Sequence, residues 1–170
     1  MSWSRRTFLL LLAAPLAGCG FHPLYGGSTV IGYDPDLAAI KVQSIADRQG
    51  QILAMALREK LNPRGIAVPQ RYVLNVILTL NRADLGIQRD ATSTRGEIQG
   101  NATYTLMLPL SDNVVFAGKS LSTSSFNILQ DGYATKVAED DARERAIHDI
   151  GDDMTLTLSL FMRAHRQAAN

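Results

Sequence analysis

Hydrophobic and polar residues alternate along three stretches of this chain, and a period of two is typical of strands with one buried face. The stretches cover Arg71–Arg82, Gln99–Leu110 and the Ser/Thr-rich run Val114–Ile128. Their connections are short, so we expect an antiparallel meander. The polar segment Arg82–Gly96 between the first two stretches fits either a loop or twisted strand ends. Gly118, inside the third stretch, is where we expect a bulge.

Two other segments change to spacings of three and four residues, which predicts helices. The first helix is expected from Asp47, as its N-cap, through Leu61. The second covers Tyr133–His165, and its acidic residues Glu139–Asp141 are expected to lie on a solvated face. Gly151 weakens this helix by about 1 kcal/mol relative to alanine, and the sequence leaves open whether the helix breaks there.

A short strand-like run at Ala39–Ile45 precedes the first helix, so the order of elements is β-α-β-β-β-α. This order predicts an α+β fold with about four mostly antiparallel strands and two helices packed on one face. A length of 170 residues with 46% hydrophobic content suits one domain with its own core and excludes wholesale disorder. We expect this domain to cover residues 37–170.

The first residues of the chain have the order of a signal peptide. Two arginines and no acid occupy residues 1–6, an apolar run of roughly ten residues follows, and small residues precede Cys19. A helix that spans a membrane needs roughly 20 apolar residues, so this segment is too short to be one. We therefore expect residues 1–18 to be removed. The pair Arg5-Arg6 also resembles the twin-arginine export signal, and the sequence leaves the export route open.

The residues around the predicted cleavage site resemble a bacterial lipobox: Leu16, Ala17, Gly18 and Cys19. The resemblance implies that the Cys19 thiol receives diacylglycerol and that its new amino group is acylated. Two or more acyl chains give stable membrane anchoring. In this class of signals, Gly20 after the cysteine is compatible with the outer membrane. Residues 19–36 are rich in Gly and Pro and are expected to act as a tether.

Charge and composition exclude several functional classes. Removal of Arg5 and Arg6 with the signal lowers the formal charge by two, from +1 to −1, which argues against a nucleic-acid partner. A single cysteine excludes an internal disulfide and a multi-cysteine metal site. The three histidines lack the spacing of a metal pair, and no nucleotide-binding or hydrolase motif is present. We therefore expect no enzyme activity, no metal and no cofactor besides the covalent lipid.

Three arginines, Arg82, Arg89 and Arg95, gather in the polar segment between the first two predicted strands. Guanidinium groups bind phosphates and carboxylates through paired donors, so this basic end of the sheet could contact an anionic glycolipid. Lys119 joins the group if its strand pairs in register. The alternative is that these are solubilising loop residues.

The start of the mature chain, Cys19-Gly-Phe-His-Pro-Leu-Tyr-Gly26, followed by β-α-β-β-β-α, resembles the LptE family of lipopolysaccharide (LPS)-assembly lipoproteins. The resemblance implies an outer-membrane lipoprotein that plugs the LptD β-barrel, helps it to assemble and binds LPS. Of the family's residues, only Cys19 is carried over. Polar strand faces, including Asn75, Thr79 and Asn81, suit a polar barrel lumen. The alternatives are an auxiliary lipoprotein of an ABC-type phospholipid-transport system and a secreted enzyme.

Overall fold

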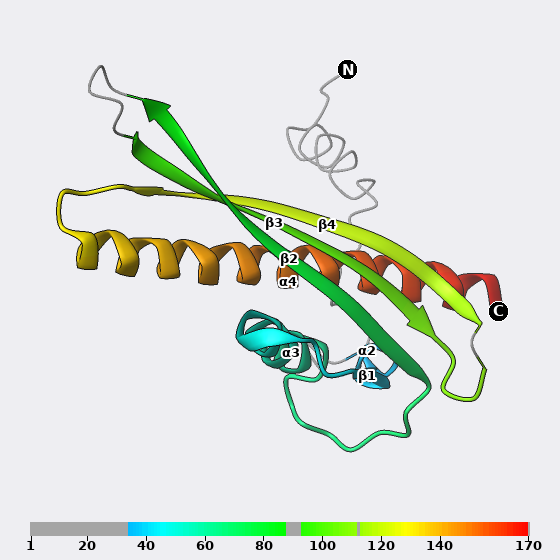
Figure 1. Cartoon of the computed structure of the whole chain (residues 1–170). Coiled ribbons are helices and arrows are strands. Elements are labelled where there is room, and N and C mark those ends of the chain that lie inside the picture. Colours follow the sequence, from blue (N-terminus) through cyan, green and yellow to red (C-terminus); the bar gives the residue numbers. More distant parts are fainter. Residues whose placement is uncertain (1–33, 88–92, 112, 170) are drawn as a thin grey trace, which may run out of the picture. The chain divides into compact units, whose positions relative to one another are not determined.

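The structure is a computed structural model that describes residues 34–87, 93–111 and 113–169. A four-stranded sheet carries helices on one face (Figure 1). The strand order is β1-β2-β3-β4; β1 is parallel to β2, and the other pairs are antiparallel. This confirms the predicted α+β fold. The elements are α2 (Pro35–Ala38), β1 (Ile40–Val42), α3 (Asp47–Leu61), β2 (Tyr72–Ile87), β3 (Ser93–Met107), β4 (Val114–Asn127) and α4 (Gly132–Ala169).

The first described residues form a short helix that the sequence did not predict. Pro35 starts α2, and the side chain of Asp34 accepts a hydrogen bond from the Asp36 backbone N–H at 2.9 Å. Proline in the first turn and an aspartate before it are common helix-start features. A helix of four residues shows no apolar period, so pattern alone could not reveal it. The predicted signal peptide and most of the predicted tether lie outside the described residues.

The polar segment between the first two predicted strands is mostly strand. β2 continues to Ile87, β3 begins at Ser93, and Leu85 pairs with Arg95. Figure 1 shows this end of the β2–β3 hairpin rising away from α4. Apolar and polar residues alternate along a strand only where one of its faces is buried. The sequence therefore loses this alternation where the hairpin extends past the helices.

The core lies between the sheet and the two long helices. The buried side chains on the sheet include Leu74, Tyr104 and Leu106, and α3 contributes Leu53 and Leu57. Each such side chain contributes about 1.5–3 kcal/mol by leaving water. From α4, the core receives Ile147, Ile150, Met154 and Leu158. These positions follow the helical stripe expected from the sequence.

Three local predictions need correction or completion. Gly118 forms no bulge: it pairs in register with Tyr104, and the register shift of this strand pair lies at Leu106/Met107. A Cβ at Gly118 would lie 2.5 Å from Tyr104 Cζ, so the ring occupies the space above the glycine. Asp47 is the first residue of α3 with φ 66°, and Ala46 is the N-cap without a side-chain hydrogen bond. Helix α4 runs unbroken through Gly151.

Candidate functional site

The face of the sheet opposite the helices is rich in uncharged polar side chains. We call it the outer sheet face and define it as the odd-numbered residues 73–85 of β2, 95–107 of β3 and 117–127 of β4. Side chains two residues apart on a strand share a face, which places these positions together. The register brings them into rows across the three strands, such as Asn75–Thr105–Ala117, Ile77–Thr103–Lys119, Thr79–Asn101–Leu121 and Asn81–Gln99–Thr123.

These rows form a surface of hydroxyl and amide groups with few charges. Ile77 and Leu121 are its large exposed apolar side chains near the middle, 73% and 67% exposed. Lys119 stands beside Thr103 in the same region. The sequence predicted the shared face of Asn75, Thr79 and Asn81 but could not supply the pairing with the other strands. Such a surface can form many neutral hydrogen bonds without burying a charge.

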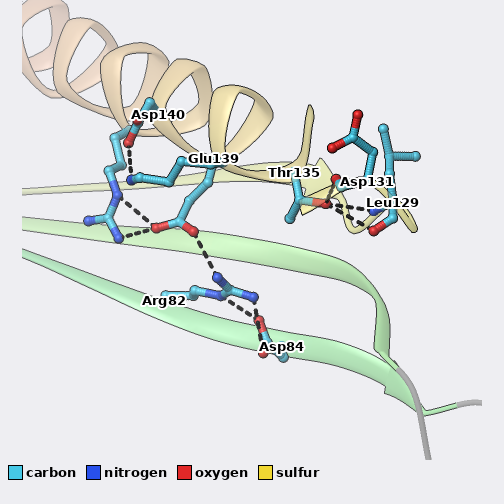
Figure 2. Close-up of polar contacts among 9 residues, drawn as sticks. Arg82, Asp84, Leu129, Asp131, Thr135, Glu139 and Asp140 are labelled. Atoms are coloured by element: carbon cyan, nitrogen blue, oxygen red, sulfur yellow. Dashed lines mark hydrogen bonds and ion pairs between the residues drawn. The ribbon is translucent and has the colours of Figure 1, made fainter. Parts of the chain in front are cut away.

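On the helix side of the sheet, Arg82 lies in a network of ion pairs (Figure 2). Its Nε donates to Asp84 Oδ1 at 2.7 Å, and its Nη1 donates to Glu139 Oε2 at 2.7 Å. Glu139 also accepts hydrogen bonds from Arg143, with a distance of 3.1 Å to Nε. Glu139 is only 6% exposed. The prediction that Glu139 lies on a solvated helix face is therefore wrong.

The start of α4 positions Glu139 beneath the sheet. The Asp131 carboxylate accepts the backbone N–H of Tyr133 at 2.8 Å in the first turn. The Leu129 N–H donates to the Thr135 hydroxyl at 2.9 Å, which ties the preceding loop to the same turn. Glu139 follows about two turns into the helix, on the side that faces β2.

The electrostatics of this network favour the ionised carboxylate. The hydrogen bond from Arg143 is the main cause that lowers the pKa of Glu139, while burial acts in the opposite direction. The charges of Arg143 and Arg82 lower the same pKa further. The Asp84 hydrogen bond is the largest cause that raises the pKa of Arg82. Arg82 is thus held by two carboxylates.

Phe126 extends this network to β4. The Arg82 guanidinium carbon lies 5.3 Å from the centre of the Phe126 ring. A Cβ at Gly96 would lie 2.4 Å from Phe126 Cζ, so the ring fills the space that the glycine leaves on β3. Arg82 therefore joins β2, β4 and α4 where the hairpin leaves the helix layer.

The proposed LPS-binding cations do not converge on one point in the described structure. Arg82 faces the helices, whereas Arg95 and Lys119 lie on the outer sheet face. Arg95 pairs with Asn127, eight residues along β4 from Lys119, which is about 26 Å at 3.3 Å per residue. Arg89 lies outside the described residues.

The predicted lipidation site also lies outside the described residues: Leu16, Ala17, Gly18 and Cys19. In the described part of the chain, no group of three or more His, Cys, Asp and Glu side chains could hold a metal ion. None of its helices combines the length and hydropathy of a membrane-crossing segment.

A second charged cluster lies where the described chain begins. Arg166 of α4 donates to Asp34 Oδ1 at 2.8 Å, and its Nε donates to Asp36 Oδ2 at 2.9 Å. Arg71 donates to the other oxygen of Asp36 at 3.2 Å. A cavity of about 330 Å³ adjoins this cluster and includes Tyr72 in its lining. The paired charges fasten α2 to the end of α4.

Comparison with known proteins identifies the family. The model of the LptE lipopolysaccharide-assembly family matches residues 37–158, more than half of the chain. This chain belongs to the LptE family. The match covers every described element except the first half of α2 and the end of α4, so the outer sheet face and the Arg82 network belong to the LptE domain.

Solved structures share the LptE fold of this chain. A putative lipoprotein from Caulobacter crescentus has a TM-score of 0.60 at 23% identity and covers 76% of this chain and 93% of its own. A minor lipoprotein from Acinetobacter baumannii has a TM-score of 0.60 at 15% identity, with 74% and 93% covered. Rare lipoprotein B from Shewanella oneidensis has a TM-score of 0.55 at 13% identity, with 75% and 98% covered. No curated protein matches this chain in sequence.

Proposed function

We propose that this LptE-family protein is an outer-membrane lipoprotein, anchored through acylated Cys19, that works with the LptD β-barrel to assemble LPS at the cell surface. It acts as a plug and assembly partner of the barrel, and it performs no chemical reaction. The observation that carries the proposal is the outer sheet face, with its rows of neutral hydroxyl and amide groups, in a chain of the LptE family.

The chemistry of this face fits the inside of a large outer-membrane barrel. The lumen of such a barrel is lined by polar side chains. A plug must replace water on its surface with protein partners, and burying an unpaired charge there would cost several kcal/mol. Hydroxyl and amide groups both donate and accept, so they can pair with many different partners in the lumen. The helices behind the sheet hold these rows in place.

LPS binding is part of the proposed role. Arg95 and Lys119 present cations on the outer sheet face, where phosphate groups of LPS can reach them. Arg89, outside the described residues, is proposed to contribute as well. The two carboxylates on Arg82 support a different task for that residue, which is to fix the hairpin to α4.

Affinity purification from detergent-solubilised outer membrane tests the proposal. A tagged full-length chain should recover a large β-barrel in about equal molar amount, because a plug and its barrel form one unit. Recovery of ABC-transporter subunits would favour the phospholipid-transport alternative. Recovery of the chain without any barrel would contradict the proposal.

A further inference from the structure

Strand β4 leaves one side of its backbone without a strand partner. In the sheet order β4 has β3 as its neighbour on one side, and no described strand lies on the other side of its 14 residues (Figure 1). A sheet edge exposes N–H and C=O groups that can pair with another extended chain. Proteins protect such edges with charges, prolines or very short strands. β4 contains no proline, and Lys119 is its single charged residue.

Exposed apolar side chains lie on both sides of this edge. Leu121, 67% exposed, is on the outer sheet face. On the helix side, the Ser122 hydroxyl donates to Asp149 Oδ2 at 3.1 Å, so this face of α4 lies along β4. Leu156 is seven residues after Asp149 and Leu160 is four further, which places both on the same face of α4. They are 44% and 51% exposed.

The aromatic contact between Phe116 and Phe161 shows that α4 stays beside β4 along this part of the edge. The centres of the two rings are 4.8 Å apart. Leu156 and Leu160 therefore lie next to the segment of β4 between Phe116 and Ser122. Along this segment, the side of the β4 backbone that faces away from β3 has no described strand partner, and exposed apolar side chains lie on both faces of the sheet.

The opposite edge of the sheet differs in its chemistry. There, β1 covers β2 only from Tyr72 to Leu74. Beyond that point β2 carries Arg82 and Asp84, which form an ion pair at 2.7 Å. Charged side chains on an edge strand hinder pairing with another chain. The β4 edge is the better surface for an added strand.

Building on the proposed function, we propose that the β4 edge receives an extended segment of the barrel partner, which pairs with β4 as a fifth strand. The strands of a closed barrel are paired with each other, so this segment comes from an inward-folded loop or a terminus. It carries apolar side chains at alternate positions to meet Leu156 and Leu160, and a polar or acidic side chain near Lys119. Leu121 belongs to both the edge and the outer sheet face, so the two form one continuous surface.

Residue-resolved hydrogen–deuterium exchange of the purified complex tests this pairing. Alternate backbone amides of β4 point toward β3, and the others point toward the open edge. In the free chain the edge amides should exchange fast, because no described strand accepts their hydrogen bonds. In the complex with the barrel, the edge amides between Ala117 and Thr123 should slow by about tenfold or more, because each now donates to the added strand.

A double variant and a control variant distinguish pairing of an added strand with β4 from contact with the barrel elsewhere on the domain. Leu156→Ser with Leu160→Ser removes the apolar cover on the helix side without touching the outer sheet face. The added strand should bind more weakly, so the edge amides of this variant should regain most of their fast exchange in the complex. Met55→Ser on α3 is the control, since Met55 is also a large exposed apolar side chain, 67% exposed, and lies on another element. This control should leave the exchange of the β4 amides unchanged.

Each result has a distinct meaning. A complex that forms with unchanged edge amides would overturn strand addition and leave the proposed function standing. Failure to recover any barrel would overturn both. Protection of the edge amides in the free chain that grows with protein concentration would show that a second copy of this chain covers the edge, and would overturn the proposed occupant.

Discussion

Arg82 Nη1 lies 2.7 Å from Glu139 Oε2, and this ion pair joins residues 57 positions apart in the chain. It connects the point where the β2–β3 hairpin leaves the helix layer with a position about two turns into α4. Arg143 holds the other oxygen of the same carboxylate. The end of the hairpin is therefore fixed by a buried acid between two guanidinium groups.

Glu139→Ala should destabilise the domain by about 1–3 kcal/mol, because it leaves Arg82 and Arg143 facing each other without their carboxylate. This value is below that of a fully buried pair, since the Arg82 side chain is 36% exposed and can be hydrated. Urea unfolding measures the change. Asp140→Asn is the control, because it removes only the exposed pair with Lys136 and should leave the unfolding midpoint unchanged. Equal midpoints for both variants would contradict this role of Glu139.

The same carboxylate should make stability depend on pH. Its pKa in the folded state is lowered, mainly by the Arg143 hydrogen bond, so folding is favoured when Glu139 is ionised. This contribution is fully present above the ordinary carboxyl pKa of about 4.3 and is lost as pH falls from there through the lower folded-state pKa. Urea unfolding between pH 6 and pH 3 should show a smaller loss in Glu139→Gln than in the parent chain. If the unfolding free energies of Glu139→Gln and the parent chain fell in parallel with pH, the Glu139 carboxylate would not be the cause of the pH dependence.

Gly118→Ala should destabilise the domain by about 1–3 kcal/mol, because the new Cβ would lie 2.5 Å from Tyr104 Cζ and push the ring from its place. Gly132→Ala is the control: it lies at the start of α4 with no neighbouring atom within 4 Å of the added Cβ. Thermal unfolding compares the two. The account of Gly118 fails if Gly118→Ala melts with the parent chain while retaining the same circular dichroism spectrum.

The double variant Arg95→Ala, Lys119→Ala should bind LPS roughly threefold to tenfold more weakly, since exposed ion pairs are each worth up to about 1 kcal/mol. Binding of purified protein to immobilised LPS at low salt measures this. Arg48→Ala on α3 removes an exposed cation from the helix side and should bind as the parent does. Unchanged binding by the double variant would remove these residues from the LPS site.

Cys19→Ala should release the chain from the membrane or leave it as an uncleaved precursor, because the thiol is the proposed site of acylation. Fractionation with a carbonate wash, followed by mass spectrometry of the amino terminus, gives the result. A Cys19→Ala chain that still pellets with carbonate-washed membranes would show that something other than the lipid anchors it.

Most of the fold could be predicted from the sequence because its signals are local. Leu78 and Leu80 alternate with the polar Thr79 and Asn81, and the strand they predict is present. Beyond Arg82 the hairpin extends past the described helices, so neither of its faces is covered by one of them. The alternation of apolar and polar residues therefore disappears, although β2 continues to Ile87. The short helix α2 and the space that Gly118 leaves for Tyr104 depend on contacts that no window of sequence displays.

The candidate site was only partly predictable for the same reason. The shared face of Asn75, Thr79 and Asn81 follows from a period of two, whereas the rows that they form with β3 and β4 require the register. The sequence grouped Arg82 with Arg95, but it could not show that the two side chains lie on opposite faces of the hairpin, because this depends on the strand register. The ion pair of Arg82 with Glu139 depends on tertiary packing across 57 positions.

The most direct test of the central claim is photo-crosslinking in intact cells from the outer sheet face. A photoreactive amino acid at Thr103, in the middle row of that face, should form an adduct with a large outer-membrane β-barrel. We expect this adduct in the membrane fraction and only when the probe is irradiated. Adducts with subunits of an ABC transporter, or no adduct with a barrel despite normal expression, would contradict the account.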